Sequence, residues 1–129
     1  MFGAWKDEIL LAVGNLNFAQ FARRPFQDAE KYPAFVVSAI SDAYTSKSEE
    51  GSAREFNRNT EIYVLVKITD RDIDAAEEKA ERLADDVMTA MDLHFEYRLN
   101  WVAREPFTFA IGANDVQAIR LEFNKEFVE

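Results

Sequence analysis

Four acidic residues have a spacing that could hold a calcium ion. Asp70, Asp72 and Asp74 alternate along the chain, and Glu81 follows in the position of the last ligand of an EF-hand loop. The sixth position of such a loop requires glycine for a sharp turn, but Ala75 stands there. An EF-hand also needs a preceding helix, whereas a strand pattern precedes these residues. We therefore interpret them as acidic residues that open a helix, where negative charge suits the helix dipole, and expect no metal site.

The single histidine is the next candidate for chemistry. His94 has Asp92 and Glu96 as close acidic neighbours in the sequence. A catalytic triad would have to include this histidine, and no glycine elbow accompanies a nucleophile. A glycine-rich loop that cradles phosphate is also missing from the sequence, because its four glycines are scattered: Gly3, Gly14, Gly51 and Gly112. We expect a surface or half-buried histidine, no catalytic residue, no cofactor and no enzyme.

Two adjacent arginines lie between phenylalanines and could bind phosphate or stack on bases. Arg23 and Arg24 have Phe21 and Phe26 beside them. The acidic excess of the chain favours the alternative, in which carboxylates pair with these arginines and fix a loop.

The charge of the chain argues against tight binding to nucleic acid. The formal net charge is −9, from 24 acidic and 15 basic residues. Proteins that grip DNA gain affinity by replacing counterions with lysine and arginine, so this chain would mostly repel it. Solubility is the simplest explanation of the charge, and a wall past which DNA slides without sticking is the alternative.

Length and composition predict one soluble domain over residues 1–129. Apolar residues make up 48% of the chain and aromatic residues 13%, which is enough to bury one core. The absence of cysteine fits a reducing compartment. No apolar run reaches the roughly 18–20 residues of a membrane span, and the N-terminus lacks a secretory pattern. We expect a protein that is made in the cytosol and has no membrane partner.

The first half of the chain predicts a helix and then an extended connection. Apolar residues recur at helical spacing over residues 5–19. Residues 20–33 contain two prolines, each of which moves the preceding residue out of the helical region, so we expect no regular element there.

A long β-hairpin is the feature that bears most on function. Residues 34–40 predict a strand, residues 41–53 a polar tip and residues 55–69 a returning strand. In the returning strand the even positions Ile62, Val64, Val66 and Ile68 share one face, which we expect to be buried. At about 3.3 Å per residue, the fourteen residues 56–69 would span about 45 Å, whereas a globule of this length is only about 36 Å across. We expect the hairpin to project and to contact neighbouring subunits. The expected interface residues are Tyr44, Lys47, Glu49, Glu50, Arg54 and Arg58.

The second half predicts a helix and two strands. Residues 74–92 carry an apolar stripe, with Asp74 or a near neighbour as the cap. A strand over residues 101–111, interrupted at Pro106, and a strand over residues 116–127 follow. The predicted fold is α+β in the order α-β-β-α-β-β, with a mainly antiparallel four-stranded sheet, two helices on one face and a projecting β-hairpin.

The order and style of these elements resemble a phage protein family. The segments that carry the resemblance are residues 32–37, the polar tip, residues 58–67 and the helix over residues 74–87. Together they resemble the tail terminator, or tail completion, proteins of long-tailed bacteriophages. The resemblance covers nearly the whole chain but includes no diagnostic motif.

The resemblance implies a structural role in the virion. Such proteins are small α+β subunits that form a hexameric ring, cap the tail tube, stop its polymerisation and join the tail to the head. The implied partners are other copies of the chain, the tail tube protein and the head–tail connector proteins, with DNA passing through the lumen without specific binding. The implied location is the tail or neck of the virion.

Two other functions remain open at this stage. The first is another phage neck or head–tail joining protein, which would assemble through the same kinds of contact but with a different ring partner. The second is a small ligand-binding or enzymatic α+β domain, whose pocket Trp5, Trp101 and the phenylalanines would line. Aromatic residues at such positions more often belong to a core.

Overall fold

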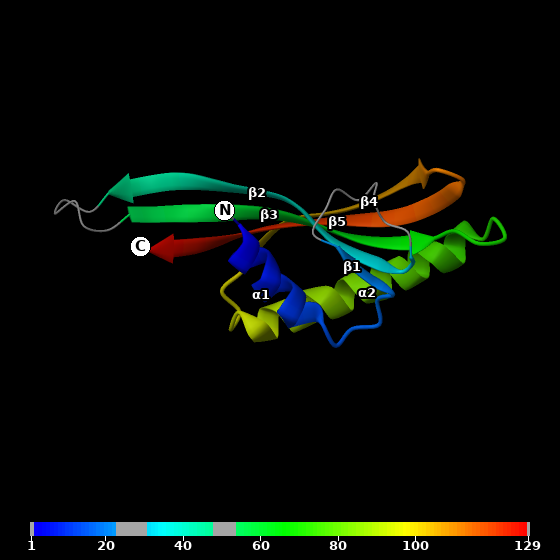
Figure 1. The fold of residues 1–129 in the computed structure, drawn as a ribbon, viewed down its shortest axis with the longest axis horizontal. Helices are drawn as coiled ribbons and strands as arrows, with labels where there is room; N and C mark the ends of the chain where they lie inside the picture. Colours follow the sequence, from blue (N-terminus) through cyan, green and yellow to red (C-terminus); the bar gives the residue numbers. More distant parts are fainter. Residues whose placement is uncertain (1, 23–30, 48–53, 129) are drawn as a thin grey trace.

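The computed structural model describes residues 2–22, 31–47 and 54–128, which form two helices and five strands (Figure 1). The elements in chain order are α1 (Gly3–Val13), β1 (Gln20–Ala22), β2 (Ala34–Lys47), β3 (Arg54–Lys67), α2 (Ile73–His94), β4 (Asn100–Ile111) and β5 (Asn114–Val128). The predicted α+β class is therefore correct.

The sheet has five strands and is mixed, so the prediction of four mainly antiparallel strands was wrong. The strand order is β1-β2-β3-β5-β4, and β1 pairs in parallel with the start of β2, from Gln20↔Ala34 to Ala22↔Val36. Sequence analysis placed β1 inside the extended connection of residues 20–33. Three residues are too few to show the alternation of apolar and polar side chains by which a strand is recognised.

The hairpin formed by β2 and β3 is longer than the sequence indicated. Its pairing continues to Lys47↔Arg54, with register shifts between Val37 and Ala39 and between Tyr44 and Ser46. The predicted first strand ended at residue 40 because the following residues are polar. These polar residues remain in the strand because that part of the sheet has no helix over it (Figure 1).

Both helices differ from the prediction at their ends. Helix α1 ends at Val13, before Gly14, rather than at residue 19. Helix α2 is capped by Asp72, whose carboxylate accepts a hydrogen bond from the Ala75 backbone N–H at 3.0 Å. At its other end α2 continues two residues past the predicted limit and includes His94.

Strand β4 passes through Pro106 without interruption, contrary to the predicted break. Pro106 lies opposite Ile119, and the register shift occurs instead between Trp101 and Ala103. Strand β4 is at the edge of the sheet, where proline is tolerated because half of the backbone N–H groups of such a strand have no partner strand to bond. Gly112, with φ of +58°, forms the turn to β5.

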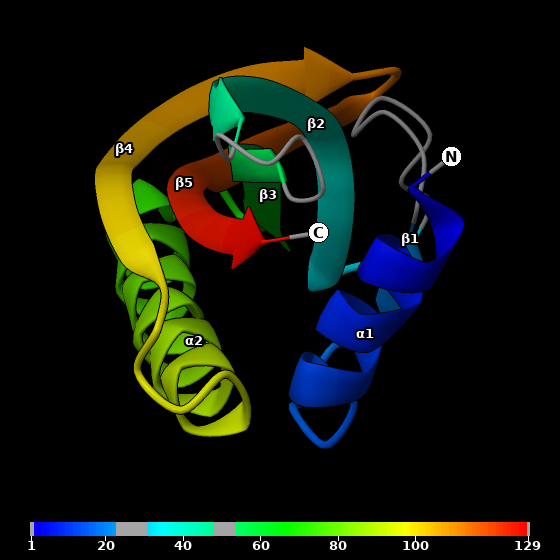
Figure 2. The same ribbon diagram turned by 90° about the vertical axis from the view of Figure 1, so that its left-hand side faces the viewer.

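The main core lies between one face of the sheet and both helices (Figure 2). The predicted face of β3 is confirmed for Ile62, Val64 and Val66, which are buried there, whereas Ile68 follows the end of the strand and is only partly buried. The predicted stripe of α2 packs against the same face: its buried members are Ala76, Ala80, Leu83, Ala84, Val87 and Met91. The indole N–H of Trp5 donates to the Thr60 hydroxyl at 3.0 Å and so connects α1 to the centre of the sheet.

A second, smaller core occupies the opposite face at one end of the sheet. Its buried members are Ala34, Val36, Tyr63, Leu65, Val116 and Ala118, with Ala22, Tyr32, Phe107 and Phe109 packed against them. The strands twist strongly between the two ends of the sheet (Figure 2). At this end of the sheet, both of its faces are therefore covered.

Candidate assembly surfaces

Three strands form a projecting arm at the other end of the sheet. We define the arm as residues 41–47 of β2, 54–59 of β3 and 124–128 of β5. Its ladder ends with Lys47↔Arg54 on one side of β3 and Glu55↔Val128 on the other. The arm extends past both helices (Figure 1). The sequence predicted a two-stranded hairpin, and the C-terminal strand therefore adds a third strand to it.

Both edges of the arm lack a strand partner among the described residues. Strand β1 pairs with β2 only up to Val36, and β4 pairs with β5 only up to Asn124. The backbone N–H and C=O groups that point outward from residues 37–47 of β2 and 125–128 of β5 can therefore pair with another chain. An exposed strand edge of this kind is a template for adding a strand.

The helix-facing side of the arm is organised around Arg58. Its guanidinium donates to both carboxylate oxygens of Asp42, at 2.8 and 3.0 Å. The guanidinium carbon also lies 5.0 to 5.7 Å from four ring centroids, which belong to Phe2, Trp5, Phe56 and Phe127. Each distance is within the range of a cation–π contact. Arg58 is thus occupied within its own chain, where it ties the base of the arm to α1, and its predicted contact with a neighbouring subunit remains untested.

Three of the other predicted interface residues lie toward the end of the arm. Tyr44 is 60% exposed, and its ring centroid is 5.4 Å from that of Phe56. Lys47 and Arg54 are backbone partners in the last pair of the β2–β3 ladder. Glu49 and Glu50, like Arg23 and Arg24, lie outside the described residues. The structure therefore brings Tyr44, Lys47 and Arg54 to one end of the molecule.

The outer face of the sheet carries an acidic cluster next to the arm. Arg120 forms ion pairs with Glu61 at 3.0 Å and Glu105 at 3.1 Å, and a third with Glu122. The hydrogen bonds that Arg120 donates to Glu122 and to Glu105 raise the pKa of Arg120, so it stays charged. Burial, and then the charge of Glu61, raise the pKa of Tyr63. Three carboxylates around one arginine leave an acidic excess on this face.

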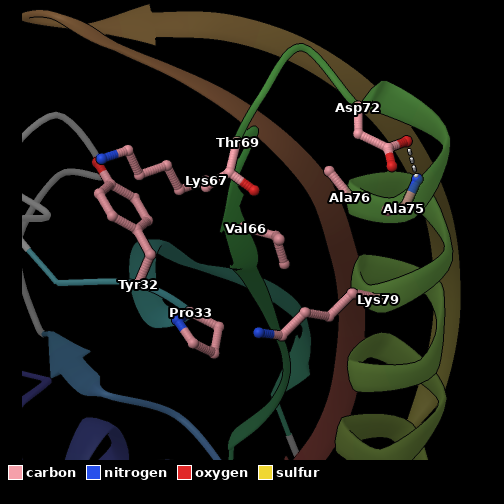
Figure 3. Close-up of a pocket in the computed structure, with 9 residues that line it drawn as sticks. All are labelled: Tyr32, Pro33, Val66, Lys67, Thr69, Asp72, Ala75, Ala76 and Lys79. Carbon is pink, nitrogen blue, oxygen red and sulfur yellow. Dashed lines mark hydrogen bonds between the residues drawn. The ribbon is translucent and has the colours of Figure 1, made fainter.

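The opposite end of the molecule contains a pocket of about 410 Å³ (Figure 3). It lies between the end of β3, the start of α2 and the segment before β2. Its lining residues are Tyr32, Pro33, Val66, Lys67, Thr69, Asp72, Ala75, Ala76 and Lys79. Lys67 extends from β3 and Lys79 from α2, both toward the Tyr32–Pro33 segment (Figure 3). No feature of the sequence predicted this pocket, because its lining residues are distant along the chain.

The acidic residues and the histidine that were first considered for metal binding or catalysis lie at positions where they stabilise or flank the helices. Asp72 caps α2 and Asp74 lies in its first turn, which confirms the simpler interpretation of the acidic cluster. The His94 Nε2 atom is 3.6 Å from Glu8 Oε1, and its ring packs edge-on against Phe95. Within residues 2–22, 31–47 and 54–128, no three histidine or acidic side chains are arranged to hold a metal ion.

No protein-family model matches this chain, and no curated protein matches its sequence. The surfaces described above are therefore interpreted from their own geometry.

The two tryptophans that a ligand pocket would use belong to the main core. Trp5 is buried, and its ring centroid is 5.2 Å from that of Phe95. Trp101 is partly buried and donates from its indole N–H to Asp92 at 2.9 Å. In the described part of the chain, no helix is both long enough and apolar enough to cross a bilayer.

Proposed function

We propose that this protein is a structural component of a phage virion that caps the tail tube as a ring, stops tube polymerisation and joins the tail to the head. The proposal rests on the resemblance to tail terminator proteins and on one observation. That observation is the three-stranded arm, which extends past the helices and has two open strand edges.

An arm of this shape is understandable if another chain covers it. A projecting sheet buries little apolar surface of its own, although its residues must still be ordered at a cost of about 1–2 kcal/mol each. Pairing with a neighbouring strand supplies hydrogen bonds and burial that offset this cost. Contacts between unlike surfaces on successive copies generate a ring when the rotation closes, and we propose a ring of six copies.

The charge of the chain suits the proposed position on the DNA path. The net charge of −9 and the acidic cluster around Arg120 would repel the phosphate backbone. A lumen wall with this charge lets DNA pass without binding it. In this proposal the protein is made in the host cytoplasm, acts without catalysing a reaction and ends in the tail or neck of the virion.

The arm can be tested by deleting residues 45–52. We expect the deletion variant to keep its far-ultraviolet circular dichroism spectrum but to lose at least tenfold in ring formation or tube capping, because it shortens the surface that meets a neighbour. The measurement is negative-stain electron microscopy of tail tubes grown with each protein. A control variant replaces the same residues with a glycine–serine linker of equal length, which separates loss of arm sequence from loss of arm length.

The same experiment distinguishes tail capping from the alternative function, that of another phage neck or head–tail joining protein. A full-length protein that leaves tube length unchanged but binds a head–tail connector would be another neck or joining protein. Normal capping by the deletion variant would remove the arm from the mechanism.

A further inference from the structure

The edge of the sheet at β4 is protected against the addition of another strand. It contains Pro106, the exposed charged residues Arg104 and Glu105, and a register shift between Trp101 and Ala103. Natural proteins use proline, charges and bulges of this kind to block pairing at an exposed edge. Strand β4 is therefore a poor template for a neighbouring chain.

The open edge of β2 has fewer of these protective features. Its ladder with β3 is regular from Ala39 to Tyr44, and the two register shifts of β2 lie at the ends of this run. The run contains no proline, and its one charged residue, Asp42, is paired with Arg58. Three of its six residues are alanine or serine, which leave room beside the strand. A strand added here would meet neither a proline nor an unpaired charge.

The second open edge of the arm belongs to β5. Residues 125–128 continue past the last pair with β4 and, among the described strands, pair only with β3. Strands β2 and β5 are both antiparallel to β3, so they point in the same direction along the arm. Two copies that lie side by side with their arms in the same direction therefore bring the β2 edge of one copy next to the β5 edge of the other.

The side chains of these two edges are complementary. Asp42 and Tyr44 lie with Arg58 on the helix-facing side of the arm. Lys125 lies on the same side, where its Nζ atom is 4.1 Å from the centre of the Phe127 ring, and it forms no ion pair within the described part of the chain. In one parallel register, Lys125 of one copy lies beside Asp42 of the next. The same register places Phe127 beside Tyr44, so an opposite-charge pair and an aromatic pair form together.

We infer that the β2 edge of one copy pairs in parallel with residues 125–128 of β5 in a second copy. This contact rests on the proposed self-assembly and names the two edges that meet. Backbone hydrogen bonds supply the affinity of such a pairing, and the side chains set its register. Because the two edges differ, each copy keeps one edge free for the next copy, as a closed ring requires.

Disulfide formation between single-cysteine variants tests this contact, because the natural chain contains no cysteine. The inferred register places Ala43 directly opposite Glu126, and both residues are exposed. A43C and E126C are mixed in oxidised glutathione, with and without tail tubes. We expect at least fivefold more mixed disulfide dimer than from A43C and E105C, because disulfides form only between closely opposed residues. Glu105 is the matched control, since it is an exposed glutamate on the β4 edge.

A charge variant shows whether the side chains direct the pairing. K125E places a carboxylate beside Asp42 of the neighbouring copy. Adding K125E to the E126C variant should therefore lower the yield of mixed dimer at least fivefold, whereas K125R should preserve it. Thermal melting of each variant verifies that it is folded.

Amide hydrogen exchange tests the same contact in the natural chain. Alternate backbone N–H groups of residues 39–44 point away from β3, and they should exchange at least tenfold more slowly in the assembled protein than in the dilute protein. The outward N–H groups of β4 should exchange equally fast in both states. Protection of β4 in place of β2 would overturn the inference.

The disulfide yields give further grounds for rejection. A mixed dimer no more abundant than with E105C, or a yield that K125E leaves unchanged, would contradict the inferred pairing. A predominance of A43C homodimers would replace it with a two-fold contact between β2 edges. A protein that forms the specific disulfide but does not cap tail tubes keeps the contact and rejects the tail function. Capping without the specific disulfide keeps the tail function and rejects this pairing.

Discussion

The body and the arm share the same strands but are stabilised in different ways. In the body, residues such as Phe35 and Val64 are fully buried between the sheet and the helices. In the arm, a single layer of strands is held by the contacts around Arg58 and by stacked rings such as Phe56 and Phe127, whose centroids are 5.2 Å apart. The comparison teaches that one continuous sheet can hold a two-layered core at one end and an arm with two open strand edges at the other.

Removing a ring from each region should give the largest difference. We expect F35A, in the body, to lower the free energy of unfolding by about 3–5 kcal/mol, because a fully buried ring leaves a cavity. F127A, in the arm, should cost less than about 2 kcal/mol, because Phe127 is only partly buried and buries less apolar area. Urea denaturation followed by tryptophan fluorescence measures both. Equal costs would mean that burial stabilises the arm as strongly as it stabilises the body.

Removing an arginine from each region should give an intermediate difference. R58M leaves the Asp42 carboxylate without its bidentate partner at a position with 15% side-chain exposure, so we expect a loss of about 2 kcal/mol. R104M breaks the exposed Arg104–Asp85 pair of the body and should cost less than about 1 kcal/mol. Urea midpoints give the values.

A double-mutant cycle isolates the arm pair. R58M combined with D42N should be more stable than the sum of the two single changes predicts, because neither partner is then left charged and unpaired. Strict additivity would show that the rings, rather than the carboxylate, hold Arg58.

The smallest expected effect concerns the alkaline limit of the body. Burial and Glu61 raise the pKa of Tyr63, so the folded state keeps the phenol protonated more strongly than the unfolded state does. This stabilisation is fully present below the unfolded value of about 10 and is lost as the pH rises through the folded value. We expect Y63F to lose less stability than the natural protein between about pH 9.5 and 11. Urea midpoints across this range measure the change, with Y97F, at a 72% exposed tyrosine, as the control.

Sequence periodicity was sufficient where one face of an element is buried. The alternation of Ile62, Val64 and Val66 and the stripe of α2 correctly identified the face that forms the main core. In the second core, Tyr63 and Leu65 are buried on the other face of the same strand. A two-sided strand cannot be distinguished from a one-sided one until the strands that flank it are known.

The sequence predictions were wrong where the position of a residue in the sheet, rather than the pattern of neighbouring residues in the sequence, decides its structure. Pro106 reads as a break in the sequence but is tolerated in an edge strand. The polar residues after Ile40 read as a loop because the pattern does not reveal how far two strands remain paired. The Asp42–Arg58 pair had a usable signal, since opposite charges stand on two strands predicted to be neighbours, but the predicted tip began before Asp42. The pocket at Lys67 and Lys79 had no such signal in the sequence, because its lining residues are distant along the chain.

Strands β3 and β5 run without interruption from the body into the arm, and this continuity has a mechanical consequence. No hinge separates the two regions within these strands, so a load applied at one extremity is borne by the same ladder that anchors the hydrophobic interior. A force applied to the arm would therefore be transmitted along the paired strands, with little bending, to the loop that follows Lys67.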